Sequence, residues 1–92
     1  MDNKIGITIL EATKERCLSA EQTFDLYILI DSIKSVLLKY QYTDKHPFFL
    51  RLIETEEYFK AYEGNPYGVG IVTAQKMIND IIDSIIIELK TI

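Results

Sequence analysis

Acidic and aromatic side chains cluster over residues 54–63, and this segment carries most of the net charge. It holds four glutamates and one lysine, a net charge of −3, whereas the whole chain has a net charge of −4. A local negative field steers association with a basic partner, and neighbouring rings supply contact area. The alternative interpretation is a solvated helix face. The candidate partner-binding residues are Glu54, Glu56, Glu57, Tyr58, Tyr62, Glu63, Asn65 and Tyr67.

Other side chains that do chemistry in proteins offer weaker patterns. Glu54, Glu57 and Glu63 are predicted to share one exposed helix face, without the apolar pocket that a general acid needs. His46, the only histidine, is expected as an exposed helix-start residue and not as a general base or metal ligand. Cys17, the only cysteine, is expected to pack as a small apolar residue near a helix end. We therefore expect no enzymatic activity, no metal site and no cofactor.

The glycine-rich stretch Gly64–Gly70 superficially resembles a phosphate-binding loop. No Gly-Lys-Ser/Thr triplet follows it, and no dinucleotide-binding fingerprint matches. Three glycines and a proline within seven residues do not sustain a helix, so the sequence predicts a connecting loop.

Length and composition narrow the class of protein. A chain of 92 residues with 48% apolar and 26% charged residues is typical of one globular domain, which we assign to residues 1–92. Ten basic against fourteen acidic residues form no basic stripe, so direct nucleic-acid binding is not expected. The sequence shows no signal peptide, and charges interrupt the apolar stretches Phe24–Leu38 and Ile78–Leu89. We expect a cytoplasmic, bacterial-type protein that does not enter a membrane.

Two helices are predicted before the acidic segment. The first runs from Lys4 to about Cys17, with a short strand at Ile5–Leu10 as the competing prediction. Ser19-Ala20-Glu21-Gln22 has the form of a capping box, which predicts a second helix with Ser19 as its N-cap, running to about Tyr40.

Two further helices are predicted to hold the acidic segment in place. Pro47 suits the first turn of a third helix, and Gly64 suits a C-terminal cap just after Glu63. Thr73 is expected to cap a fourth helix from Ala74 to about Lys90. The predicted fold class is all-α, a small four-helix bundle.

Apolar spacing predicts which face of each helix is buried. The second helix is apolar over more than half of its circumference, and Asp25, Ser32, Ser35 and Lys39 form the remaining stripe. Phe24–Leu38 is therefore either central to the bundle or pairs with a second chain, as in a homodimer. The predicted inner residues of the first helix are Ile5, Ile9, Leu10, Ala12 and Cys17. Those of the third helix are Phe48, Leu52, Phe59 and either Phe49 or Tyr62. Those of the fourth helix are Met77, Ile78, Ile81, Ile82, Ile85 and Leu89.

Three stretches resemble small helical bacterial immunity proteins of the colicin D immunity type. The run Leu18–Tyr27 is similar to the Ser-Ala-Glu, Phe, Tyr opening of that family. Leu52–Asn65 resembles its acidic helix, which ends in an aromatic-Glu pair and a turn, and Thr73–Leu89 resembles its closing amphipathic helix. The likeness covers most of the chain as a pattern of residue types.

The resemblance implies a four-helix bundle that binds a cognate tRNA-cleaving toxin domain. In such proteins acidic side chains stand in for phosphates and cover the basic cleft of the toxin. By position, this role falls on Glu56, Glu57, Tyr62 and Glu63. The chain departs from the family at Gly64-Asn65-Pro66, which has no acid, and also in its longer glycine-rich loop and its widely apolar second helix.

Three functional hypotheses follow from different classes. The first is a toxin-neutralising immunity protein that acts by charge mimicry. The second is a structural or regulatory homo-oligomer, in which Phe24–Leu38 forms the interface and the acids keep the assembly soluble. The third is a small-ligand binder with a site between helices and Gly64–Gly70 as its lid.

Overall fold

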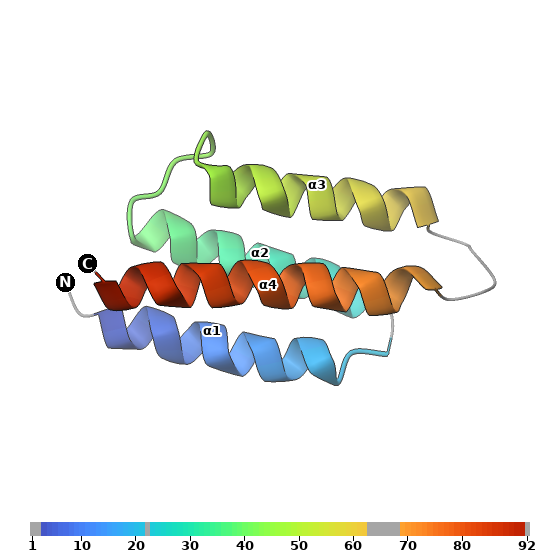
Figure 1. The fold of residues 1–92 in the computed structure, drawn as a ribbon, viewed down its shortest axis with the longest axis horizontal. Coiled ribbons are helices and arrows are strands. Elements are labelled where there is room, and N and C mark those ends of the chain that lie inside the picture. The colour runs from blue at the N-terminus through green and yellow to red at the C-terminus, as the bar shows by residue number, and fades with distance from the viewer. Residues whose placement is uncertain (1–2, 22, 63–68, 92) are drawn as a thin grey trace.

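The computed structural model describes residues 3–21, 23–62 and 69–91. These residues form four α-helices and no strand: α1 (Asn3–Leu18), α2 (Thr23–Lys39), α3 (Pro47–Tyr62) and α4 (Val69–Thr91). In Figure 1 α4 lies in front, α2 lies behind it, and α1 and α3 flank the pair. α4 packs along α1 and α3, and α1 also packs along α2. The predicted all-α four-helix bundle is confirmed, and residues 5–10 are helical.

The chain enters α2 differently from the prediction. Ser19 was expected to cap α2, but its hydroxyl donates to the carbonyls of Glu15 and Arg16 in the last turn of α1, at 3.3 and 3.2 Å. α2 begins only at Thr23. The capping-box prediction is wrong because serine also satisfies the unpaired carbonyls at a helix C-terminus. Gln22 lies outside the described residues.

The start of α4 also differs from the prediction. α4 begins at Val69, so Thr73 lies inside the helix and does not cap it. Val69 and Gly70, predicted as part of the loop, belong to the first turn of α4. Residues 63–68, including Gly64 as the predicted cap of α3, lie outside the described residues.

A left-handed residue ends α2 and aims two tyrosines at other helices. Gln41 has φ of 68°, and the amides of Gln41 and Tyr42 donate to the carbonyls of Leu38 and Leu37. This paired hydrogen bonding is the Schellman pattern of helix termination. It places Tyr40 against α1 and Tyr42 against α4, where both hydroxyls form hydrogen bonds.

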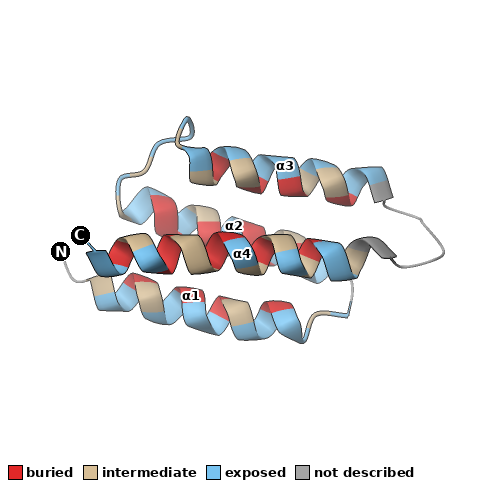
Figure 2. Ribbon diagram, in the orientation of Figure 1, coloured by how far each residue is buried: buried red, intermediate tan, exposed pale blue. Residues whose placement is uncertain are grey.

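Figure 2 shows the buried residues as stripes on the facing sides of the helices. α4 supplies the largest stripe, and the predicted inner residues Ile78, Ile81, Ile82, Ile85 and Leu89 are all buried. Met77 is only half-buried, and Ile86 is buried although it was not predicted. On α3 the buried aromatics are Phe49 and Phe59, whereas Phe48 is half-buried; Leu52 and Thr55 complete that stripe.

The predicted inner face of α1 is only partly correct. Leu10 and Cys17 are buried as expected, but Ile5 and Ile9 are 49% and 39% exposed and Ala12 is exposed. The remaining buried positions are Gly6 and Thr13. The four buried residues, Gly6, Leu10, Thr13 and Cys17, recur at helical spacing, so one narrow stripe of mixed polarity faces the bundle.

Large apolar side chains also remain at the surface. Phe24, Ile28 and Leu38 of α2 are 68%, 43% and 60% exposed. One side of α2 therefore faces solvent, and α2 is not a central helix surrounded by the others. Within the described ranges no helix is both long enough and apolar enough to cross a membrane.

Gly6 allows α1 to approach the end of α2 closely. Its amide donates to the Tyr40 hydroxyl at 2.9 Å. A Cβ at position 6 would overlap the Tyr40 ring. Because Gly6 has no side chain, the ring of Tyr40 can pack directly against the backbone of α1.

We predict that Ile85→Ala lowers the free energy of unfolding by about 2–4 kcal/mol, because Ile85 is fully buried and truncation leaves a cavity. Urea denaturation measures the change. Ile87→Ala is the matched control, since Ile87 is 64% exposed on the same helix. Equal losses in the two variants would contradict the observed orientation of α4.

We predict opposite effects of Gly6→Ala in two backgrounds. In the wild-type background alanine collides with the Tyr40 ring and weakens its hydrogen bond, so the urea midpoint falls. In a Tyr40→Ala background the collision is absent, and alanine should stabilise the helix by about 0.5–1 kcal/mol through its higher helix propensity. Additive effects would show that Gly6 and Tyr40 are not coupled.

Candidate functional site

The glutamates of α3 divide into two groups. Glu54 and Glu57 are exposed, and no ion pair involves either of them among the described residues. Glu56 is half-buried, and its Oε1 lies 2.5 Å from Nζ of Lys34 on α2. Glu56 follows the buried Leu52 by one helical turn, so it sits at the inner edge of α3 and faces α2.

The ion pair changes the charge that the predicted surface presents. With Glu56 neutralised by Lys34, residues 54–63 keep Glu54, Glu57, Glu63 and Lys60, a net charge of −2. The structure therefore places Glu56 as a contact between α2 and α3, and it leaves Glu54 and Glu57 as the accessible carboxylates among the described residues of this segment.

The aromatic part of the predicted surface turns partly inward. Tyr58 is half-buried and packs against the core. Phe59 is 3% exposed, and its ring meets Tyr27 of α2 edge to face, with centroids 5.6 Å apart. Tyr62 is the last residue of α3. The side chain of Tyr62 lies outside the described part of the chain, as do the predicted site residues Glu63, Asn65 and Tyr67.

A shallow groove between α3 and α4 brings a further acid beside Glu54. Its polar lining includes Glu54 and Arg51 of α3 and Asp80 of α4. Asp80 is exposed, and it was not among the site residues predicted from the sequence. No local pattern identifies this residue, because its position beside Glu54 depends on how the two helices pack. The groove is lined by Arg51, Glu54, Thr55, Met77, Asp80 and Ile81.

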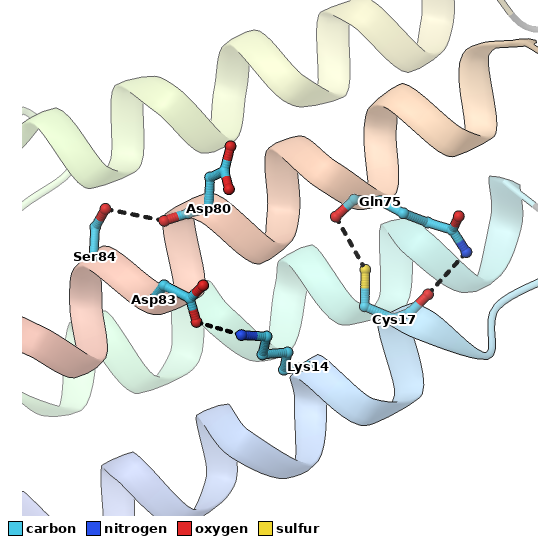
Figure 3. A network of polar contacts seen from close by, with 6 residues as sticks. All are labelled: Lys14, Cys17, Gln75, Asp80, Asp83 and Ser84. Atoms are coloured by element: carbon cyan, nitrogen blue, oxygen red, sulfur yellow. Dashed lines mark hydrogen bonds and ion pairs between the residues drawn. The ribbon is translucent and has the colours of Figure 1, made fainter.

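Hydrogen bonds fix the groove from the α4 side. Arg51 Nη1 donates to the Ser84 hydroxyl at 3.3 Å, and that hydroxyl donates to the Asp80 carbonyl at 2.9 Å, as Figure 3 shows for the second contact. The guanidinium of Arg51 therefore lines the same groove as Glu54 and Asp80, without an ion pair to either among the described residues. It offsets part of their charge and restrains where a basic partner group can approach.

The opposite edge of α4 is tied to α1. Lys14 Nζ lies 2.6 Å from Oδ1 of Asp83, and the Gln75 side chain donates to the Cys17 carbonyl at 3.0 Å (Figure 3). The Gln75 side chain also donates to the Ala20 carbonyl at 3.0 Å. Asp83 is thus paired, whereas Asp80, one turn earlier, has no ion pair with any other residue that the structure describes.

Cys17 behaves as a packing residue, as predicted. It is fully buried, and its thiol donates to the Gln75 carbonyl at 3.7 Å. Burial raises the pKa of the Cys17 thiol from its usual value to about 11. A thiol that keeps its proton at neutral pH is a poor nucleophile and a poor metal ligand.

A polar and aromatic cluster closes one end of the bundle. The rings of Tyr42 and Phe48 both pack against His46, with centroids 4.7 Å from it in each case. His46 precedes α3, and its Nδ1 accepts the Phe48 amide at 3.2 Å, so the imidazole acts as the N-terminal cap of that helix. His46, expected as an exposed helix-start residue, is half-buried.

Tyr42 also joins this cluster to α4. Its hydroxyl donates to Oε2 of Glu88 at 2.5 Å. Burial, the hydrogen bond to Glu88 and the negative charge of Glu88 raise the pKa of Tyr42 to about 12. No three histidine, cysteine, aspartate or glutamate side chains come together as a metal site in the described part of the chain.

Comparisons of this chain with protein-family models, with curated proteins and with solved structures found no match.

We predict that Tyr42 ionises at a higher pH than an ordinary tyrosine, near pH 12. Its neutral form is stabilised in the fold, so this contribution to stability is complete below pH 10 and is lost as the pH rises through about 12. Tyrosinate absorbance during an alkaline titration measures it. Glu88→Gln should move this late ionisation to lower pH, and Tyr42→Phe should abolish it. A late step that persists in Tyr42→Phe would contradict the assignment.

Proposed function

We propose that this protein is an immunity or antitoxin protein. It binds a cognate bacterial nuclease toxin of the tRNA-cleaving type and covers the toxin's basic active-site cleft with an acidic surface. The observation that carries the proposal is the exposure of Glu54 and Glu57 on α3, with Asp80 of α4 beside Glu54 at the groove. The resemblance of the sequence to colicin D immunity proteins supports the same function.

The spacing of these carboxylates suits a cleft that binds a phosphate backbone. Glu54 and Glu57 are three residues apart on one helix, so their Cβ atoms are neighbours at about 5–6 Å. Asp80 extends the negative charge across the groove. Exposed carboxylates keep their hydration until a partner approaches, and their field then accelerates encounter with a basic surface.

The paired glutamate has a different role in this proposal. Glu56 is held by Lys34 at 2.5 Å, so its charge is largely satisfied within the chain. The proposed contact surface therefore rests on Glu54, Glu57 and Asp80, together with the sequence-predicted Tyr62, Glu63, Asn65 and Tyr67. Tyr58, which packs against the core, supports the helix from below.

We predict that neutralising the groove acids abolishes protection against the toxin. The variant Glu54→Gln/Glu57→Gln/Asp80→Asn should fail to rescue growth when co-expressed with the toxin encoded by the adjacent gene. Its association rate should fall by about tenfold or more, because steering by three rim charges is lost. The affinity of the wild type should fall as salt rises, since the Debye length is about 8 Å at physiological ionic strength.

The control removes the same charge elsewhere. Glu11→Gln/Glu15→Gln/Glu21→Gln changes three exposed acids at α1 and just after it, and it should protect as well as the wild type. Circular dichroism should show that both variants fold. Equal protection by both variants, or an adjacent gene that encodes no toxic domain, would remove charge mimicry as the function.

A further inference from the structure

The outer side of α2 carries a heptad-like row of exposed residues. Phe24, Ile28, Asp31, Ser35 and Leu38 follow one another at spacings of four, three, four and three, the spacing of the contact positions in a coiled coil. The three apolar members are 68%, 43% and 60% exposed. The burial pattern of α2 puts its core residues on the opposite side, so this row faces away from the bundle.

The neighbouring helices α1 and α3 also carry exposed apolar residues. Lys14 and Asn3 bond α4 from one side of α1, and Ile5 and Ile9 lie on another side of that helix. On α3, Arg51 and Thr55 line the groove with α4, and Ile53, 39% exposed, projects away from it. In Figure 1, α1 and α3 lie on either side of α2.

The charges of α2 are arranged for pairing with an antiparallel copy of the same helix. Asp25 lies in the first turn and Asp31 near the middle, whereas Lys39 ends the helix, and all three are exposed. A parallel pair would place Asp25 beside Asp25 of a second copy. An antiparallel pair places it near Lys39 of the second copy, and the row itself then brings Ile28 against Leu38 and Asp31 beside Ser35.

We propose that a second copy of this chain docks on the outer face of α2, forming a twofold dimer with antiparallel α2 helices. The molecule extends 45 × 26 Å across its broad side, and α2 lies at the back of this side in Figure 1, so the side is large enough for the roughly 800 Å² that each partner buries in a stable interface. Twofold symmetry makes the patch complementary to itself, so no second surface is required. The proposed dimer face is separate from the groove between α3 and α4. The proposal of a dimer therefore does not depend on whether a toxin binds at that groove.

The first test measures mass in solution. Light scattering or sedimentation across a concentration series should give twice the chain mass of 10.7 kDa for the wild type. Leu38→Asp and Ile28→Asp should shift the protein to the monomer and weaken self-association at least tenfold. Ile87→Asp is the matched control, because Ile87 is 64% exposed on α4, and it should remain dimeric.

The second test fixes the orientation. Ile28→Cys and Leu38→Cys are prepared separately, one with an affinity tag, then mixed and oxidised; the native Cys17 is buried and stays in place. The antiparallel dimer predicts a disulfide between the two different variants and little within either alone, because only the mixed pair brings the two thiols together.

Charge reversal gives an independent readout. Asp25→Lys should weaken self-association, and adding Lys39→Asp should restore it, because the swapped charges again attract. A wild type that remains monomeric at all concentrations overturns the proposal. So does a loss of dimer in Ile87→Asp equal to that in Leu38→Asp, or a cross-link of each cysteine variant with itself. A helical circular dichroism spectrum of every variant separates these outcomes from unfolding.

Discussion

Burial of the isoleucine stripe of α4 is the constraint on which the rest of the structure depends. Ile78, Ile81, Ile82 and Ile85 are at most 2% exposed, and α4 packs along both α1 and α3. In a domain of this size the core is small, so one such stripe supplies a large share of the apolar burial that opposes chain entropy. The position of each polar residue on α4 relative to its neighbours follows from that packing.

Ion pairs between helices decide which charges remain available at the surface. Lys34 is paired with Glu56 and Lys14 with Asp83, so each of these two acids contacts an adjacent helix. Such partly exposed pairs add little to stability. Their larger effect is on which acids can contact a partner, because Glu56 and Asp83 are paired whereas Glu54 and Asp80 line the groove between α3 and α4.

The molecule presents two unlike faces on opposite sides of its core. The groove between α3 and α4 is acidic and suits a basic partner, whereas the outer side of α2 is apolar with charges of both signs and suits a copy of itself. Both proposals depend on the same fact, that α2 and α4 lie across the bundle from each other (Figure 1). Occupation of one face therefore leaves the other accessible.

The sequence by itself determined the four helices and most of the buried residues of α3 and α4, because a 3.6-residue apolar period is a local property of the chain. The exceptions are Phe48 and Met77, which are only half-buried, and Ile86, which is buried but was not predicted. The sequence did not place the start of α2 or of α4. Ser19 and Thr73 have the chemistry of caps, yet a hydroxyl satisfies helix carbonyls equally well, and the choice depends on the neighbouring elements. The sequence also missed Gly6, which is buried because a ring from another helix fills its space.

The candidate site shows the same division. The sequence located the acidic segment of α3, since charge and helical spacing are visible along the chain. Only the tertiary structure decided that Glu56 is paired, that Tyr58 packs inward and that Asp80 joins Glu54. Each of these facts depends on residues more than twenty positions apart in the sequence, or on which side of a helix faces the core. A local pattern in the sequence predicts a helix, but the packing of the helices against one another decides which side chains remain on the surface.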